Sequence, residues 1–281
     1  MYCDYFNDKV VTFISYGGIL MDLKIMTFNV LNGWSTSNIG KRDDLAASAI
    51  LEHEPDIIGF QELDGNYRLA EDPLPKLISP KYSEAGAEHT SWNPIFYNTE
   101  RLRVVACGEQ AFEKGTVYDY PLGGISGFRT ISYALLEDMS ATKKVLVFNL
   151  HYDMNKDWQT CLDNQAAESR QVLSLAKELL QKYEADALFV TGDYNSKISG
   201  VPCVSMLENG FVDTHALAEE KDDMGSCARL GEALWGDYNS AAIDHVFYMG
   251  RAMLRVKKYE TVDNIREASD HSPVCVTVEI N

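Results

Sequence analysis

Carboxylate, amide and imidazole side chains lie at the ends of six short apolar runs in this 281-residue chain. Four runs end in such groups: "LKIMTFNVLN" at Asn29, "PDIIGFQEL" at Gln61 and Glu62, "KVLVFNLHYD" at Asn149, His151 and Asp153, and "DALFVTGDYNS" at Asp193 and Asn195. Two more begin with them: "AAIDHVFYM" at Asp244 and "ASDHSPVCVTVEI" at Asp270 and His271. Groups of these types can bind a metal ion, move a proton and stabilise a phosphoryl group.

Three of these residues offer hard oxygen ligands. The carboxylates of Glu62 and Asp270 and the amide oxygen of Asn29 suit Mg²⁺ or Mn²⁺ rather than zinc. None of the six cysteines forms a CxxC pair or lies at zinc-ligand spacing from a histidine. The sequence therefore predicts a Mg²⁺ site, with Mn²⁺ as the alternative ion.

The remaining groups fit acid–base and phosphate chemistry. Asp193 is a candidate to orient and deprotonate a water, and Asn195 could hold that water or a phosphoryl oxygen. His271 and His151 could donate hydrogen bonds to a phosphoryl oxygen, and Asp244 could orient His271 and favour its protonated form. No serine or cysteine lies in a nucleophile-elbow context, and no P-loop or GxGxxG is present. The pattern favours direct attack by an activated water.

Each group taken alone also has a structural interpretation. A carboxylate after a strand is usually a turn former or a helix cap, "GDYN" could be a β-turn, and "SDH" could precede a strand as a simple turn. The joint occurrence of such groups at six strand ends is what favours a functional site.

The six runs have the length and the Gly, Pro, Asn and Asp borders that are typical of β-strands. The run "VCVTVEI" alternates, as a strand with one buried face does. If the last two strands run antiparallel to the other four, all six polar ends lie at one edge of the sheets.

Two amphipathic helices are expected between these strands. "KRDDLAASAILEHEP" places Leu45, Ala46, Ala49 and Ile50 on one face, and Pro55 closes the helix. "LDNQAAESRQVLSLAKELLQKY" carries a stripe at alternating steps of four and three, formed by Leu162, Ala166, Ser169, Leu173, Ala176 and Leu180. We expect Glu168, Lys177 and Lys182 to face outward. Strands with such helices indicate a layered α/β or α+β architecture.

From about Leu23 to the C-terminus, the chain resembles the endonuclease/exonuclease/phosphatase superfamily. The family groups deoxyribonuclease I, exonuclease III-type enzymes, neutral sphingomyelinases, inositol-polyphosphate 5-phosphatases and deadenylases. The resemblance is carried, in the family's order, by "TFNVLN", "PDIIGFQE", "NPIFYNTERL", "FNLHYD", "ESRQ", "TGDYN", "IDHVF" and "SDHSPV". It implies metal-dependent hydrolysis of a phosphoester by an α+β protein, a four-layer αββα sandwich of two packed mixed sheets flanked by helices.

The resemblance also implies roles for single residues. Glu62 matches the principal metal ligand, and Asn29 and Asp270 complete the metal environment. Asp193 and Asn195 match the residues that handle the attacking water. For the phosphate side, the implied residues are His271 on the scissile phosphate, Asp244 as its partner and His151 as a stabiliser of the transition state.

Two positions depart from the family's pattern. Many members carry an acid two residues after the first asparagine, where this chain has Leu31, and this weakens a DNA-repair interpretation. Members often have Arg or Lys immediately before the "ID" motif, where this chain has Ala242. Arg129 in "GFRTISY" is a weak candidate to supply the missing substrate contact.

The acidic balance of the chain bears on its substrate. A net charge of −17 repels a long polyanion, so we expect a small phosphodiester or phosphomonoester, or a lipid or sugar-phosphate head group. The basic stretch "GRAMLRVKKY" is interpreted as a solvated strand face or turn. Substrate choice is expected in three loops: "NGWSTSNIGKR", "KGTVYDYPLGGISGFR" and the acidic segment Ala218 to Ser240, which is either a lid or a connection.

Two rival functions remain. A nuclease acting on DNA or RNA would need a basic groove despite the global charge. A catalytically silent binding module would need to lack a core site residue, yet all are present.

The chain ends and the class of the protein complete the expectations. We expect residues 1–21 to be an N-terminal extension or extra strand and residues 22–281 to form a single catalytic domain. The apolar stretch Val10 to Met21 is too short to span a bilayer and lacks the features of a signal peptide. With its scattered cysteines, the chain is expected to be cytoplasmic.

Overall fold

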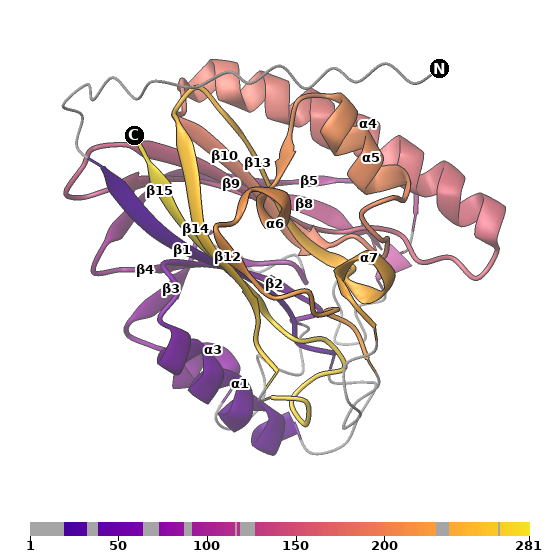
Figure 1. The fold of residues 1–281 in the computed structure, drawn as a ribbon, viewed down its shortest axis with the longest axis horizontal. Coiled ribbons are helices and arrows are strands. Elements are labelled where there is room, and N and C mark those ends of the chain that lie inside the picture. The colour runs from indigo at the N-terminus through magenta and orange to yellow at the C-terminus, as the bar shows by residue number, and fades with distance from the viewer. Residues whose placement is uncertain are drawn as a thin grey trace.

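The computed structural model describes residues 20–32, 39–63, 73–86, 92–115, 117–118, 127–228, 236–263 and 265–281. Within these ranges, the strands form two large mixed sheets with helices on their outer faces (Figure 1). This confirms the expected α+β sandwich with αββα layers. Most of the expected N-terminal extension, residues 1–19, lies outside the described residues, as does most of the Gly- and Tyr-rich loop.

The first sheet contains the strand that ends at Asn29 and the strands next to Glu62 and Asp270. In the described part of the chain it has seven strands, in the order β12 (Glu220–Lys221), β14 (Leu254–Thr261), β15 (Val274–Ile280), β1 (Met21–Asn29), β2 (Ile57–Gln61), β4 (Ile95–Asn98) and β3 (Tyr82–Glu84). β2 runs parallel to β1, and β15 runs antiparallel to it.

The second sheet contains the strands that carry His151, Asp193 and Asp244. Its six described strands follow the order β11 (Val212–Asp213), β13 (Asp244–Gly250), β10 (Ala187–Asp193), β9 (Lys144–His151), β8 (Thr130–Asp138) and β5 (Leu102–Ala111). β9 runs parallel to β10, and β13 runs antiparallel to it. A separate small ladder joins β6 (Val117–Tyr118) to β7 (Gly127–Phe128).

Helices cover the outer face of each sheet, as Figure 1 shows. The first sheet is covered by α1 (Ile39–His53) and α3 (Leu74–Leu77), and the second by α4 (Trp158–Tyr183) and α5 (Val201–Glu208). Two single-turn helices, α6 (Thr214–Leu217) and α7 (Tyr238–Ala241), lie in the connections around β13. No helix in these described ranges is long and apolar enough to cross a membrane.

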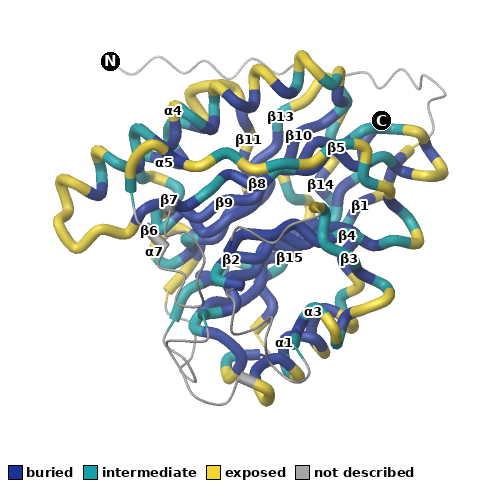
Figure 2. Tube along the Cα trace, turned by 180° about the vertical axis from the view of Figure 1, so that it is seen from behind, coloured by how far each residue is buried: buried dark blue, intermediate teal, exposed yellow. Residues whose placement is uncertain are grey.

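The strands of both sheets are largely buried (Figure 2), and their side chains alternate between two sides of each sheet. On β1, Ile25 packs between the two sheets, whereas the next residue, Met26, packs against the cluster under α1. On β15, Val274, Val276 and Val278 enter the layer between the sheets, while Glu279 is half-buried. Burial of one face of "VCVTVEI" is therefore as expected.

The first expected helix is confirmed. α1 buries Ala46, Ala49 and Ile50 and half-buries Leu45, and it ends at His53, two residues before Pro55. A proline disfavours helical conformation in the residue before it, so the chain leaves the helix here.

The buried face of the second helix was predicted only in part. α4 buries the neighbouring stripe, formed by Cys161, Gln165, Glu168, Ser169, Val172, Leu175, Ala176 and Leu179. Of the expected stripe, only Ser169 and Ala176 are buried, and Leu162, Ala166, Leu173 and Leu180 are half-buried. Two adjacent stripes on a helix have the same period, so spacing alone does not show which of them faces the sheet.

Glu168, expected to face outward, is fully buried. Its Oε2 accepts the backbone N–H of Asp153 at 3.0 Å, and this contact ties α4 to the residues that follow β9. Its Oε1 has no hydrogen-bond partner among the described residues. Burial, with the nearby Asp153 charge, raises the pKa of Glu168 to about 8.

This raised pKa predicts how stability changes with pH. Between the ordinary carboxyl pKa of 4.5 and about 8, the unfolded chain releases the Glu168 proton while the folded protein keeps it. The contribution is therefore favourable below pH 4.5 and is lost as pH rises, by up to roughly 1.4 kcal/mol per unit. Urea unfolding from pH 5 to 8 should show that Glu168→Gln loses less stability with rising pH than the wild type.

A matched control is Glu178→Gln, which changes an exposed glutamate on the same helix. Its unfolding free energy should follow the wild-type pH dependence. If Glu168→Gln also followed the wild-type curve, the folded-state proton would not be on Glu168.

Candidate active site

The six polar strand ends meet at one end of the two sheets, as the sequence predicts. β1, β2, β9 and β10 point their carboxyl ends this way, and β13 and β15, which run antiparallel, begin there. In the backbone register of the second sheet, Asp193 of β10 lies opposite Asp244 of β13 on one side and His151 of β9 on the other. The remaining members are Asn29 at the end of β1, Glu62 immediately after β2, and Asp270 with His271 ahead of β15.

The amide of Asn29 joins carboxylates that belong to the two different sheets. Its Nδ2 lies 3.1 Å from Glu62 Oε1 and 3.0 Å from Asp193 Oδ2, so each amide hydrogen has a carboxylate acceptor. Its Oδ1 accepts the backbone N–H of Leu31 at 3.0 Å, which fixes the orientation of the amide. Asn29 is almost completely buried, so these charge-assisted bonds are shielded from solvent.

Glu62 is held in a conformation that few residues adopt. Its φ is 62°, in the left-handed region, and its Oε2 accepts the backbone N–H of Asn32 at 2.9 Å and the Asn32 side chain. Burial would raise the pKa of Glu62, but the positive charge on His151 and the Asn32 and Asn29 donors outweigh it and lower the pKa. Glu62 is therefore an anion at neutral pH.

Asp193 is the buried centre of the histidine side of the site. His151 Nε2 lies 3.2 Å from its Oδ2, and the backbone N–H of Asn195 donates to Oδ1 at 2.8 Å. Burial alone would raise the pKa of Asp193, but His151 and His271 outweigh it and hold the pKa well below its usual range. Asp193 is therefore an anion at neutral pH.

His271 and Asp244 form a close pair. His271 Nδ1 donates to Asp244 Oδ2 at 2.8 Å, and both side chains are buried. Burial would lower the pKa of His271, but the charges of Asp244 and Asp193 raise it well above its usual value. The structure thus contains the pair that the sequence predicts, with the proton on the imidazole.

Asp270, next to His271, has the environment of an unneutralised carboxylate. Its Oδ1 is buried and has no hydrogen-bond partner in the part of the chain that is described. Burial raises the pKa of Asp270, and this effect, with the negative charges of Glu62 and Asp193, outweighs the lowering by the His271 charge. A buried oxygen without a partner beside a second carboxylate is the kind of site that a cation would stabilise.

Asn195 and Arg129 meet on one backbone carbonyl. Asn195, with φ at 45°, donates from Nδ2 to the Tyr152 oxygen at 2.9 Å, and Arg129 Nη1 donates to the same oxygen. Arg129 is buried beneath this carbonyl. Contact of Arg129 with a substrate stays a prediction, whereas its contact with the site's backbone is part of the fold.

Beneath the site, buried amide side chains bond the two sheets to each other, and we call these contacts the polar seam. Sequence analysis gave it no role. Gln61 Nε2 of the first sheet donates to Asn149 Oδ1 of the second at 2.7 Å, and Asn149 Nδ2 donates back to the Phe60 oxygen at 2.6 Å. Both amides are completely buried. Gln61 and Asn149 stand at polar strand ends in the sequence, but nothing there indicates that they bond to each other.

His245 is a second residue that sequence reasoning missed. Its Nε2 donates to the Ser196 carbonyl at 2.9 Å, and the Tyr238 hydroxyl lies 3.2 Å from its Nδ1. Burial lowers the pKa of His245, so the ring is neutral. His245 follows Asp244 directly and anchors the turn that carries Asn195.

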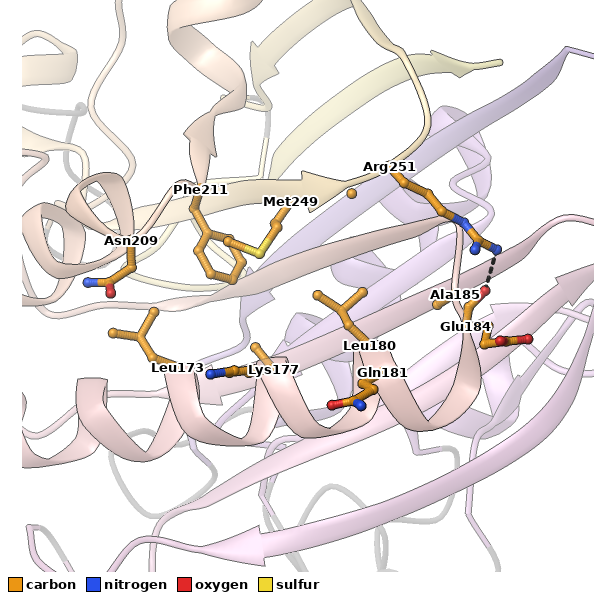
Figure 3. A pocket seen from close by; sticks show the side chains of 12 residues that line it. Leu173, Lys177, Leu180, Gln181, Glu184, Ala185, Asn209, Phe211, Met249 and Arg251 are labelled. Atoms are coloured by element: carbon orange, nitrogen blue, oxygen red, sulfur yellow. Dashed lines mark hydrogen bonds between the residues drawn. The ribbon is translucent and has the colours of Figure 1, made fainter.

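A cavity of about 600 Å³ lies away from these groups (Figure 3). It is lined by Leu173 and Leu180 of α4 together with Phe211 and Met249, and Arg251 donates to the Glu184 carbonyl at its rim. β13 runs from Asp244 at the site to Gly250 at the cavity, and seven strand residues span about 20 Å. The cavity therefore does not contain the clustered polar groups.

The chain matches known proteins over nearly its whole length. The sequence profile of the endonuclease/exonuclease/phosphatase family matches residues 26–271. A structure of a protein of that family from Bacteroides thetaiotaomicron superposes with a TM-score of 0.75 at 21% identity, over 94% of this chain and 97% of that one. No curated protein matches this chain at a significant level.

Two further solved structures differ in what their names describe. A mannosyl-6-phosphatase of Bacteroides thetaiotaomicron VPI-5482 has a TM-score of 0.71 at 22% identity, covering 91% of this chain and 99% of that one. TDP2 of D. rerio, solved with a single-strand DNA product, has a TM-score of 0.67 at 16% identity, covering 92% and 98%. At such identities the likeness shows the fold alone.

The polar seam predicts a severe effect at Gly59. A Cβ there would lie 2.3 Å from Thr191 Oγ1 and 2.5 Å from Asn149 Oδ1, so Gly59→Ala must push the sheets apart or break the seam. We expect the free energy of unfolding in urea to fall by roughly 1–3 kcal/mol.

The matched control is Gly40→Ala in α1, where a Cβ meets nothing within 4 Å. Because alanine favours a helix, this variant should be as stable as the wild type or more stable by up to about 1 kcal/mol. Equal stability of Gly59→Ala and the wild type would contradict close contact of the two sheets at the seam.

Proposed function

This chain belongs to the endonuclease/exonuclease/phosphatase family, and we propose that it is a divalent-metal-dependent phosphoesterase acting on a small substrate. The family supports a hydrolase of the phosphoesterase or nuclease type. The observation that carries the proposal is the linkage of Glu62 to Asp193 through one buried amide, with His271 beside Asp193. This linkage unites a carboxylate side with a histidine side in one site.

The carboxylate side fits Mg²⁺ or Mn²⁺. Glu62 and Asp270 would hold the ion, because Asp270 Oδ1 is buried without a partner among the described residues and both groups are hard oxygen donors. When bound, the ion would polarise a phosphoryl oxygen and lower the pKa of a coordinated water. Asn29 turns its nitrogen toward the carboxylates, so we assign it first to holding them, and direct ligation by its oxygen stays a prediction.

A second group of donor atoms is less suited to a metal. Asp193, Asp244 and His271 bring donors within 4.8 Å of one another. However, His271 Nδ1 already donates to Asp244 at 2.8 Å, and an imidazole protonated on both nitrogens has no lone pair to give to an ion. We therefore interpret this group as a charged hydrogen-bond network rather than as the metal site.

The histidine side fits a phosphoryl group and a water. His271 Nε2 lies 3.8 Å from Asp193 Oδ2, which is beyond hydrogen-bonding range, so Asp193 does not take its N–H, which would donate to a phosphoryl oxygen. His151 Nε2 lies 3.2 Å from Asp193 Oδ2, where it would help to stabilise charge that develops on the phosphoryl group. Asp193 would accept a hydrogen bond from the attacking water, and Asn195 would help to hold that water.

The distribution of charge supports a small substrate. The basic stretch from Arg251 to Lys258 starts before β14, at the end opposite the site, and reaches the middle of that strand, because Leu254 pairs with Ile280 and Lys258 with Thr277. Its cations pair with carboxylates: Arg251 with Asp186, Arg255 with Glu219 and Glu279, Lys257 with Asp22 and Glu279, and Lys258 with Glu260. They therefore offer no unneutralised surface for a nucleic-acid backbone.

The named structural relatives cover both substrate sizes, a sugar phosphate for one and DNA for the other. With a net charge of −17, this chain is better suited to the first class. Leu31 and Ala242 replace an acid and a base of the family's pattern, and they also favour a small phosphoester over DNA as the substrate.

The proposal is tested with a phosphoester panel in Mg²⁺, in Mn²⁺ and in EDTA. We expect hydrolysis of bis-p-nitrophenyl phosphate or of sugar and inositol phosphates with either ion, none in EDTA, and little cleavage of supercoiled DNA or short RNA. Asp193→Ala and His271→Ala are the controls and should each lower turnover by roughly 10²-fold or more.

Two results would contradict the proposal in different ways. Efficient DNA or RNA cleavage, falling steeply with salt, would identify a nuclease instead. Full activity in EDTA, or in both variants, would show that this site does not carry out the hydrolysis.

A further inference from the structure

We infer that Ser226 is a positioning residue of this site, whose hydroxyl orients Asp244 and through it His271. The inference deepens the proposed function and rests on it. No motif in the sequence indicates Ser226, which lies within the acidic segment expected to be a lid or a connection.

The segment that contains Ser226 packs directly against the Asp270–His271 pair. The Ala228 N–H donates to the backbone carbonyl oxygen of Asp270, and the Ser272 N–H donates to the backbone carbonyl oxygen of Ser226, both at 2.8 Å. Cys227 and His271 face each other between these bonds as an antiparallel bridge. Ser226 itself is completely buried, so this part of the segment is packed against the site as part of the fold.

The hydrogen bonds that the Ser226 hydroxyl accepts leave only one acceptor toward which its proton can point. Its oxygen accepts the backbone N–H groups of Ile243 at 3.1 Å and of Asp244 at 3.0 Å. A hydroxyl has two lone pairs and one proton, and the two N–H groups occupy the lone pairs. The proton therefore goes to Asp244 Oδ2, which lies 2.6 Å away.

This bond determines how Asp244 meets His271. The same Oδ2 accepts Nδ1–H of His271 at 2.8 Å, whereas Oδ1 has no hydrogen-bond partner in the described ranges. The two donors on Oδ2 thus set the rotation of the carboxylate. Without the hydroxyl, the carboxylate can turn about its own axis, and His271 Nε2 loses its fixed direction toward Asp193.

A double-mutant cycle tests the inference. With bis-p-nitrophenyl phosphate and Mn²⁺, Ser226→Ala should lower kcat about tenfold with little change in KM, as expected for a lost hydrogen bond to a charged group. Asp244→Asn should lower kcat further, and the double variant should be no slower than Asp244→Asn. Independent, additive losses would overturn the inference.

The matched control is Ser140→Ala. It removes a serine–aspartate hydrogen bond of the same length, 2.6 Å to Asp138, at a turn far from the site. Its kcat should equal that of the wild type. If Ser226→Ala does not fold, Ser226→Cys, which keeps the shape with a weaker donor, replaces it in the cycle with the same expected order.

A spectroscopic measurement separates this inference from the proposed function. The Nδ1–H proton NMR signal of His271, assigned by its loss in His271→Gln, should shift in Ser226→Ala and stay in place in Ser140→Ala. This holds even if the wild type hydrolyses none of the phosphoesters, in which case only the proposed function fails. An active wild type with an unshifted signal and wild-type kcat in Ser226→Ala would overturn the role of Ser226 alone.

Discussion

The site depends on one constraint, the joining of two sheets by buried amides where two negative charges approach each other. Asn29 gives one amide hydrogen to Glu62 and the other to Asp193, and Gln61 and Asn149 bond beneath them. Without these donors, the buried Asp193 and the half-buried Glu62 from different layers would repel each other and lack partners. The amides therefore hold together the fold and the arrangement of the reacting groups.

The charges around this junction divide the site into two halves. Glu62 and Asp270 form a negative half that a cation would complete, whereas Asp193 lies beside His151 and His271 in a half where the raised pKa of His271 keeps a positive charge on that imidazole. Glu62, Leu31 and Asn195 also hold positive φ values, a strained backbone that the packed sheets sustain. Electrostatics and backbone strain are thus concentrated at one end of an otherwise regular sandwich.

Strand periodicity and polar strand ends are local signals, and they predicted the six strands and their convergence, whereas the four layers were implied by the resemblance to the family, whose motifs have a fixed order. The sequence pattern placed Glu168 wrongly, because helical spacing does not distinguish adjacent stripes. It could not give the Gln61–Asn149 contact or the bond from Ser226 to Asp244, because these join residues 88 and 18 positions apart that lie in different elements. Long-range polar contacts appear only once the packing is known.

The central claim is that the two halves form one metal–phosphate site, and crystals soaked in Mn²⁺ and inorganic phosphate test it most directly. The account predicts an anomalous Mn²⁺ peak about 2.0–2.2 Å from carboxylate oxygens of Glu62 and Asp270, with a phosphate oxygen on Nε2 of His271. A Mn²⁺ ion bound instead among Asp193, Asp244 and His271, with the imidazole as its ligand, would contradict it.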